Sequence, residues 1–185
     1  MSTLPGLLEA TARPLGLAPR AAGVSGANPL NVDVPHQEQD CWCWCAVTVG
    51  IAKFYDRTFA LSQCQTAARV LGIADACQRP TADDVNRMFD LDMSLAAFGR
   101  FDAMDLALSF AQVKRQIDTQ RPVAARIRFM DSGLAHFAVI RGYRETPEQM
   151  LVIDDPLYDE TEITYREFLT RYKGEGVWKQ SYLTR

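Results

Sequence analysis

Three thiols and two indoles occupy the five consecutive positions from Cys41 to Cys45. The apolar run from Val47 to Tyr55 follows directly and predicts a buried helix from about Cys43 to Asp56. The unpaired N–H groups at a helix N-terminus favour negative charge, and a thiol is an effective nucleophile only as its thiolate. A cysteine at this junction is therefore a candidate nucleophile.

Only two histidines are present as candidate general bases. His36 lies in a predicted loop, whereas His136 begins a run that is apolar on both faces and indicates a covered strand. Asp154 and Asp155 follow the next predicted strand, and antiparallel pairing of the two strands would bring a carboxylate close to His136. The two carboxylates point to opposite sides of an extended chain, so spacing leaves open which one faces the imidazole. A thiol, an imidazole and a carboxylate are the nucleophile, base and orienting group of covalent acyl transfer.

The repeated Cys-Trp pair leaves two candidates for the nucleophile. Cys41 and Cys43 are each followed by a tryptophan, but only Cys43 has a glutamine, Gln37, six residues before it. Cys45 is followed by an alanine and is expected to face into the helix packing. We expect Cys43 to be the nucleophile, with Cys41 as the alternative.

A structural zinc site is a different interpretation of the cysteine cluster. The C-x-C-x-C spacing does not match the usual Cys-x₂₋₄-Cys pair, and Cys64 and Cys77 would have to supply the other half of the site. Five cysteines cannot all pair within one chain, although Cys64 and Cys77 could form a disulfide in an oxidising compartment. We expect no metal and no cofactor.

Composition and charge exclude several classes of protein. Hydrophobic residues make up 48% of the 185 residues and charged residues 23%, which is typical of a globular protein. The net charge of -3 argues against a nucleic-acid binder with a basic surface. No apolar run approaches the roughly 18 residues of a membrane span, and residues 1–30 lack a secretory signal pattern. We expect a soluble protein that is cytoplasmic or delivered by a specialised secretion system.

The predicted elements indicate an α+β chain with two lobes. Residues 1–30 are predicted to be a flexible tail or propeptide, with a processing site before the catalytic domain of residues 31–185. Helices precede strands, so we expect a helical lobe at about 31–120 and an antiparallel sheet lobe at about 121–185, with the site between them. The predicted strands are Asn31–Val34, Val123–Phe129, Ala135–Tyr143, Met150–Asp154 and Val177–Leu183. The helices predicted after the first one begin at Ser62, Thr81, Ser109 and Tyr165, and the Ser62 and Ser109 signals have the capping-box pattern.

These motifs resemble the papain-like cysteine proteases. Gln37, Cys43 with the tryptophan after it, and Ala46 are similar to the start of the active-site helix in that family. The run from His136 to Tyr143 resembles its catalytic-histidine strand, and Asp155 before a proline resembles the third member of its triad in compact bacterial branches. Those branches include the peptidases that mature bacteriocin leaders and the cysteine-protease effectors of plant pathogens. The resemblance covers roughly residues 32–183.

The resemblance implies a role for each matching residue. Cys43 would be the nucleophile, His136 the base and later the acid, and Asp155 the group that orients the imidazole. Gln37 would donate to the oxyanion of the tetrahedral intermediate. The tryptophan after the nucleophile, Trp44, would pack between the lobes and shield the contact between His136 and Asp155 from water.

The expected function is a cysteine peptidase that cleaves a peptide bond through a thioester. Its partner would be a protein or peptide substrate. If it acts as a bacterial effector or toxin, we expect an inhibitory or immunity protein as a second partner. The same residues could deamidate glutamine or transfer an acyl group. From a different class, the chain could be a peptide-binding domain without catalysis, but such a domain has no use for Gln37, Cys43, His136 and an Asp-Pro together.

Overall fold

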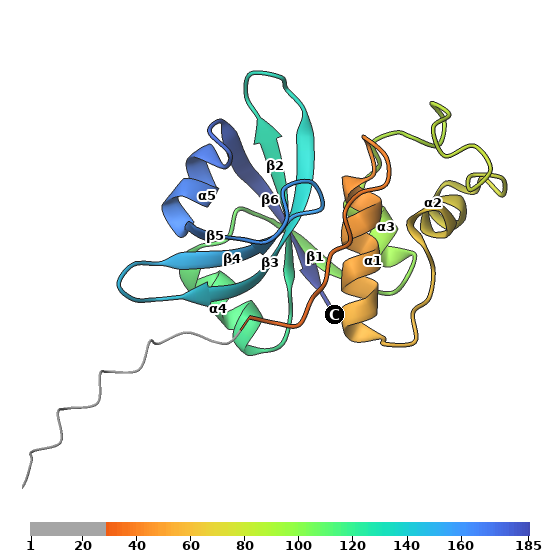
Figure 1. Ribbon diagram of the computed structural model, residues 1–185. Helices are drawn as coiled ribbons and strands as arrows, with labels where there is room; N and C mark the ends of the chain where they lie inside the picture. The colour runs from red at the N-terminus through yellow and green to blue at the C-terminus, as the bar shows by residue number, and fades with distance from the viewer. Residues whose placement is uncertain (1–28) are drawn as a thin grey trace, which may run out of the picture.

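The computed structural model describes residues 29–185, so all but the last two residues of the predicted tail lie outside the described residues. A six-stranded sheet forms the larger part of the molecule, and three helices pack together on one side of it (Figure 1). Two further helices lie against the strands on the other side (Figure 1). The α+β fold expected from the sequence is confirmed. Within the described residues, no helix has the length and apolar character that crossing a membrane requires.

The sheet is antiparallel throughout and its strand order is β1-β6-β2-β3-β4-β5. Its strands are β1 (Phe101–Leu106), β2 (Val123–Phe129), β3 (Ala135–Arg144), β4 (Met150–Asp154), β5 (Thr161–Thr164) and β6 (Gly176–Thr184). The central strands β2 and β3 are buried on both faces over much of their length. Their sequences are therefore nearly continuous apolar runs. β2, β3, β4 and β6 lie where the sequence predicted strands.

Local capping signals fix most helix boundaries. The helices are α1 (Cys43–Tyr55), α2 (Gln63–Leu71), α3 (Leu91–Ala96), α4 (Phe110–Asp118) and α5 (Tyr165–Arg171). Ser62 and Ser109 each form a complete capping box with the glutamine three residues later, as predicted. α1 is buried almost all round from its first residue, so it is the central helix that its apolar run indicated.

The predicted strand Asn31–Val34 is extended but joins no sheet. Its side chains alternate between exposed and buried, which is the pattern that suggested a strand. Separate hydrogen bonds hold this part of the chain instead of a strand pairing. The N–H of Leu30, just before the segment, donates to the carbonyl of Arg141 at 2.7 Å, and the N–H of Val34 donates to the carboxylate of Asp154 at 2.9 Å. The segment therefore anchors the beginning of the described chain to β3 and β4.

The prediction of a helix that begins at Thr81 is wrong. Residues 81–85 form successive turns, and the side chain of Asp84 binds the guanidinium of Arg79 at 2.6 Å instead of capping a helix. The short helix α3 follows in its place. The carboxylate that the spacing assigned to a cap is thus used in an exposed ion pair within the turns.

The first edge strand crosses the predicted boundary between the lobes. β1 and α4 both precede residue 120, yet β1 pairs with β6 and α4 packs on β3. β1 is exposed at nearly every position, so its sequence has no alternation of apolar and polar residues to reveal a strand. The sheet lobe therefore begins near residue 101 rather than near residue 121.

A close approach joins α1 to the segment that precedes it. An added Cβ on Gly50 would come within 2.9 Å of the Cα of Val34 and 3.0 Å of the carbonyl oxygen of Asp33. Any larger residue would push the segment away from the helix. Since the segment continues into the loop before Cys43, Gly50 helps to set the position of that loop.

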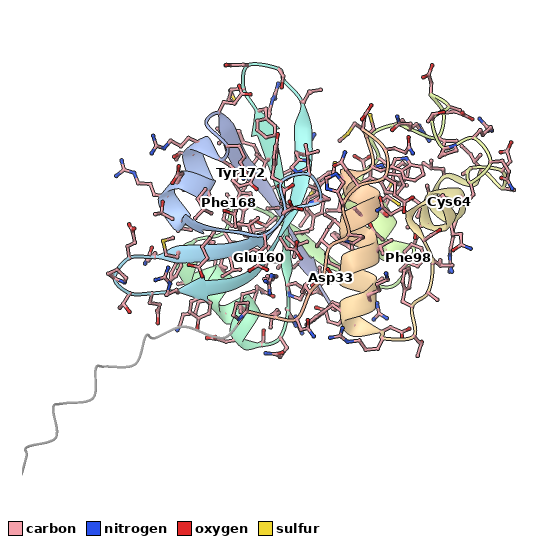
Figure 2. The ribbon with its side chains drawn as sticks, viewed as in Figure 1. Asp33, Cys64, Phe98, Glu160, Phe168 and Tyr172 are labelled. Atoms are coloured by element: carbon pink, nitrogen blue, oxygen red, sulfur yellow. A yellow bond between two sulfur atoms is a disulfide. The ribbon has the colours of Figure 1, made fainter. Side chains whose placement is uncertain are left out.

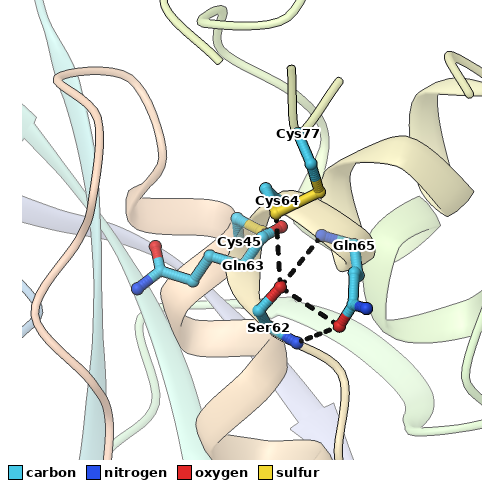
Figure 3. The surroundings of a disulfide bond; sticks show 6 residues. All are labelled: Cys45, Ser62, Gln63, Cys64, Gln65 and Cys77. Carbon is cyan, nitrogen blue, oxygen red and sulfur yellow. Dashed lines mark hydrogen bonds between the residues drawn. A yellow bond between two sulfur atoms is a disulfide. The ribbon is translucent and has the colours of Figure 1, made fainter. Parts of the chain in front are cut away.

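A disulfide joins α2 to the turn that follows it. Cys64 and Cys77 pair, as the sequence suggested for an oxidising compartment, and the capping box of Ser62 and Gln65 lies next to the bond (Figure 3). The side chain of Gln63 points away from the disulfide (Figure 3). The bond therefore holds the first turn of α2, which also carries Gln63.

Candidate active site

Cys43 is the first residue of α1 and is almost completely buried. Its backbone N–H has no partner within the helix, because the first turn of a helix lacks preceding carbonyls. The helix N-terminus also favours a negative charge on this side chain. The apolar run after Cys43 thus places a thiol at the N-terminus of a buried helix.

The imidazole of His136 lies between the thiol and a carboxylate. Nε2 of His136 donates to Oδ1 of Asp155 at 2.8 Å, and both side chains are buried. The imidazole and the Cys43 thiol line the same cavity, and their interaction helps to raise the pKa of the imidazole. Antiparallel pairing of Val139 in β3 with Asp154 at the end of β4 brings the two strand ends together. The structure therefore places Asp155 against the histidine.

Asp155 is held by four hydrogen bonds. Besides the imidazole, Oδ1 accepts from the backbone N–H groups of Leu157 at 2.8 Å and Tyr158 at 3.0 Å. Oδ2 accepts from the hydroxyl of Tyr172 at 2.9 Å. The ring of Tyr172 packs edge-to-face against that of Phe168, with the centroids 5.1 Å apart (Figure 2). These donors fix the carboxylate in one orientation and keep it ionised.

Charge and burial act in opposite directions on this pair. Burial by itself lowers the pKa of His136, but hydrogen bonds to Asp155 and Cys43 and the charge of Asp155 outweigh it and raise the pKa to about 9. Burial raises the pKa of Asp155, and the contact with His136 and the other donors more than offset this, so its pKa is lowered. The imidazolium and carboxylate forms are therefore favoured at neutral pH. Burial and Asp155 raise the pKa of Tyr172, which keeps its hydroxyl protonated as a donor.

Gln37 lies in the loop that faces the thiol and lines the same cavity. Its amide nitrogen donates to the carbonyls of Gln39 at 3.0 Å and Asp40 at 2.9 Å, while its side-chain oxygen is buried without a partner among the described residues. Its backbone N–H donates to the carbonyl of Pro156 at 2.8 Å, which ties the loop to the residue after Asp155. To donate to an oxyanion, the amide has to direct one hydrogen away from these loop carbonyls.

A second glutamine, Gln63, holds the Gln37 loop from the helical lobe. Its Nε2 donates to the carbonyl of His36 at 2.7 Å, and its Oε1 accepts from the N–H of Glu38 at 3.1 Å. Gln63 is buried, and its own carbonyl accepts from the thiol of Cys45 at 3.0 Å. One side chain thus fixes the backbone on both sides of Gln37.

The other cysteines and Asp154 lie outside this arrangement. Cys41 is partly exposed and is not among the residues that line the cavity, and burial, followed by the charges of Cys43 and Asp40, raises its pKa. Cys45 is fully buried in the packing of α1, as expected, and burial raises its pKa. Asp154 accepts from the backbone of Val34 instead of from the imidazole, and burial raises its pKa.

The expected position of Trp44 is wrong. Its indole N–H donates to the carbonyl of Arg87 at 2.9 Å and its ring packs on Phe89 with the centroids 5.3 Å apart, in the segment before α3. The rings that flank His136 are instead those of Tyr158, at 5.9 Å, and Phe129, at 6.4 Å. Since α1 turns by about 100° per residue, consecutive side chains at its start face different parts of the molecule.

Tyr172, Tyr158 and Gln63 are site residues that the sequence did not reveal. Tyr172 lies at the end of α5 and Gln63 at the start of α2, far from the motif in the sequence, and no spacing rule connects either residue to it. His36 contributes only its backbone carbonyl, and its side chain is exposed. Tertiary contacts alone bring these residues to the site.

Cys43, His136 and Gln37 line one cavity of about 270 Å³. Apolar side chains that are exposed at its rim surround them, namely Met88, Leu134, Leu157 and Tyr158. Within residues 29–185, no group of three or more histidine, cysteine or acidic side chains is arranged to hold a metal ion. The cavity brings together a thiol, an imidazole and a side-chain amide, which are groups that acyl transfer can use.

Comparison with known proteins places these features in a family. Residues 30–183 match the family described as Peptidase_C39 like family. Among solved structures, the fold is similar to that of a C39-like peptidase candidate from Bacillus anthracis, with 13% identity and a TM-score of 0.54. The match covers 84% of this chain and 96% of that one. No curated protein matches the chain.

Proposed function

Since the chain belongs to the Peptidase_C39 like family and is a papain-like cysteine protease, we propose that it cleaves peptide bonds with Cys43, His136 and Asp155 as its triad. The observation that carries this proposal is the hydrogen-bonded pair of His136 and Asp155, in one cavity with a thiol at a helix N-terminus. The substrate is a protein or peptide.

Acylation begins with the Cys43 thiolate and the His136 imidazolium. The sulfur attacks the carbonyl carbon of the scissile bond, and the carbonyl oxygen takes the negative charge. The backbone N–H of Cys43 and the amide of Gln37 donate to this oxyanion, and one such donor typically contributes roughly 10²–10³ in rate. His136 then gives its proton to the departing amine, which leaves a thioester on Cys43.

Deacylation uses the same groups in reverse. The neutral imidazole takes a proton from water, and the resulting hydroxide attacks the thioester carbonyl. Collapse of the second tetrahedral intermediate expels the Cys43 thiolate and releases the carboxylic acid product. Asp155 holds the imidazole in place and stabilises its charged form in both steps, while staying ionised itself.

Covalent labelling tests the identity of the nucleophile. A thiol-reactive epoxide inhibitor such as E-64 should add once to the wild-type protein, as measured by intact mass, and should abolish the cleavage of a peptide library. Cys43→Ala should lose both labelling and cleavage, because neither of the other free cysteines, Cys41 and Cys45, lines the cavity with His136.

Cys41→Ala is the matched control, since it removes a neighbouring thiol that does not line the cavity. It should keep both labelling and cleavage. The opposite pattern in the two variants would move the nucleophile to Cys41. If peptides are deamidated without being cut, the reaction class is wrong even though the triad is right.

A role as a bacterial effector or toxin is a separate part of this proposal. It rests on the resemblance to the effectors of plant pathogens, and an inhibitory or immunity protein would then be the partner. Co-expression with neighbouring genes, followed by a cleavage assay, tests this role: a gene product that blocks cleavage by forming a complex supports it.

A further inference from the structure

Two more cavities adjoin the active-site cavity. One, of about 270 Å³, lies between residues 87–90 and the strands β2 and β3, and it shares Met88 with the active-site cavity. The other, of about 410 Å³, lies over β2 and β6 and shares Ala135 with it. Arg126 lines both of the additional cavities, so the three cavities are linked by shared lining residues, and we call the two added cavities the track.

The two added cavities are strongly basic. Four cationic side chains line them, and Asp90 is the single carboxylate among their lining residues. The four are Arg87, Arg126, Arg128 and Lys179. The protein as a whole carries a net charge of -3, so this basic track differs in sign from the rest of the surface. Ion pairs among the described residues include none of the four, which leaves their charges available to a ligand.

Strand register places two of these cations one position before and one position after the residue that pairs with His136. On β3, His136 pairs with Ile127 of β2, and Arg126 and Arg128 are the residues on either side of Ile127. Because side chains in a strand alternate between faces, the two arginines lie roughly 7 Å apart on the same face of β2, opposite to the face of Ile127 and His136. Both are exposed. Arg126 lines the cavity that shares Met88 with the active-site cavity, and both arginines line the cavity that shares Ala135 with it, so a substrate that extends from Cys43 into either cavity meets a guanidinium group.

We propose that this basic track binds acidic side chains of the substrate next to the scissile bond. The inference rests on the proposed peptidase function and adds the class of substrate. Guanidinium groups bind carboxylates through paired hydrogen bonds, and an overall acidic protein attracts an acidic peptide only where its surface is locally basic. The apolar rim at the centre of the site, formed by Met88, Leu134 and Tyr158, binds the uncharged side chains closest to the cleaved bond.

A positional peptide library tests the proposal. Each position around the scissile bond is varied between Asp or Glu, their amides Asn or Gln, and Lys. The kcat/KM of the wild-type enzyme should be roughly five- to tenfold higher for acidic peptides than for the amide versions. This is the combined effect expected from two largely exposed ion pairs, each of which contributes little by itself. The preference should shrink at high salt, because salt screens exposed charges.

Two variants assign the preference to the track. Arg126→Gln with Arg128→Gln should reduce the acid-over-amide ratio to nearly one, and a urea unfolding transition equal to that of the wild-type protein shows that the variant is folded. Arg126→Glu with Arg128→Glu should favour Lys peptides. Arg115→Gln with Arg166→Gln is the control, because it removes two exposed arginines on α4 and α5 that line none of the three cavities, and it should keep the wild-type preference.

The outcomes separate this inference from the proposed function. Cleavage of peptides without any preference for acidic residues, or a preference that survives in both track variants, overturns the inference alone. No cleavage of any peptide, together with no inhibitor labelling of Cys43, overturns the peptidase proposal and the inference with it.

Discussion

At the scale of single residues, the site depends on how strongly Asp155 holds a charge on His136. Three donors besides the imidazole fix the carboxylate, and one of them, the hydroxyl of Tyr172, is buried in the core. The carboxylate in turn keeps the imidazole charged although it is buried. The pair therefore behaves as a preformed ion pair beside the thiol.

Asp155→Asn removes the charge but keeps the shape of the side chain. The wild-type kcat/KM should fall as pH rises through about 9, because the imidazolium that protonates the leaving amine is then lost. In the variant the carboxylate no longer raises the pKa of His136, so this decline should begin at a lower pH, and kcat should drop by roughly 10² or more. Profiles of kcat/KM against pH for the two proteins measure both effects. An unchanged alkaline limb would show that Asp155 does not control the imidazole.

At the scale of elements, the first turn of α2 positions the loop that carries Gln37. The disulfide and the capping box fix that turn (Figure 3), and Gln63 extends from it to the backbone on both sides of Gln37. Gln63 is thus a positioning residue rather than a catalytic one. Its effect on the reaction should appear in turnover and not in the reactivity of the thiol.

Gln63→Ala should leave two backbone groups of the loop without partners and reduce stability by about 1–3 kcal/mol. We expect kcat/KM for a peptide to fall roughly ten- to hundredfold, because the Gln37 donor loses its position. The rate of Cys43 alkylation by iodoacetamide should stay unchanged, since His136 sets the reactivity of the thiol.

Gln65→Ala is the matched control in the same helix turn. It removes part of the capping box without a contact to the Gln37 loop, so stability should fall slightly while kcat/KM is kept. If the alkylation rate of Cys43 and kcat/KM fall by the same factor in Gln63→Ala, Gln63 only supports the fold.

At the scale of the whole molecule, the helical lobe has less regular structure than the sheet lobe. Residues 73–90 form turns between α2 and α3, and the disulfide between Cys64 and Cys77 closes the loop that begins this segment. A cross-link of this length restricts the unfolded chain and typically stabilises a protein by about 3 kcal/mol. The helical lobe should therefore be the part of the molecule that is sensitive to reduction.

Cys64→Ser with Cys77→Ser should lower the free energy of unfolding by roughly 2–3 kcal/mol, measured by urea denaturation. Treating the wild-type protein with a reductant should give the same loss, and the reductant should not affect the double variant. Peptidase activity below the unfolding transition should be largely retained, because neither cysteine lines the active-site cavity. An equal stability of oxidised and reduced wild type would show that the bond does not constrain the fold.

Local signals in the sequence determined much of this protein. The apolar run after Cys43 predicted the central helix, the capping boxes at Ser62 and Ser109 predicted α2 and α4, and apolar runs predicted the strands β2, β3, β4 and β6. These signals succeed because propensity, capping and burial act between residues that are close in the chain. The motifs around Cys43, His136 and Asp155 likewise sufficed to indicate the papain-like family.

Only the tertiary structure decided the contacts between distant residues. It placed Asp155 rather than Asp154 against the imidazole, because the end of β4 pairs with β3 in one register. It turned Trp44 into the helical lobe, brought Tyr172 and Gln63 to the site, and added the exposed edge strand β1 to the sheet. Each of these outcomes depends on packing between segments far apart in the chain, for which spacing along the sequence carries no signal.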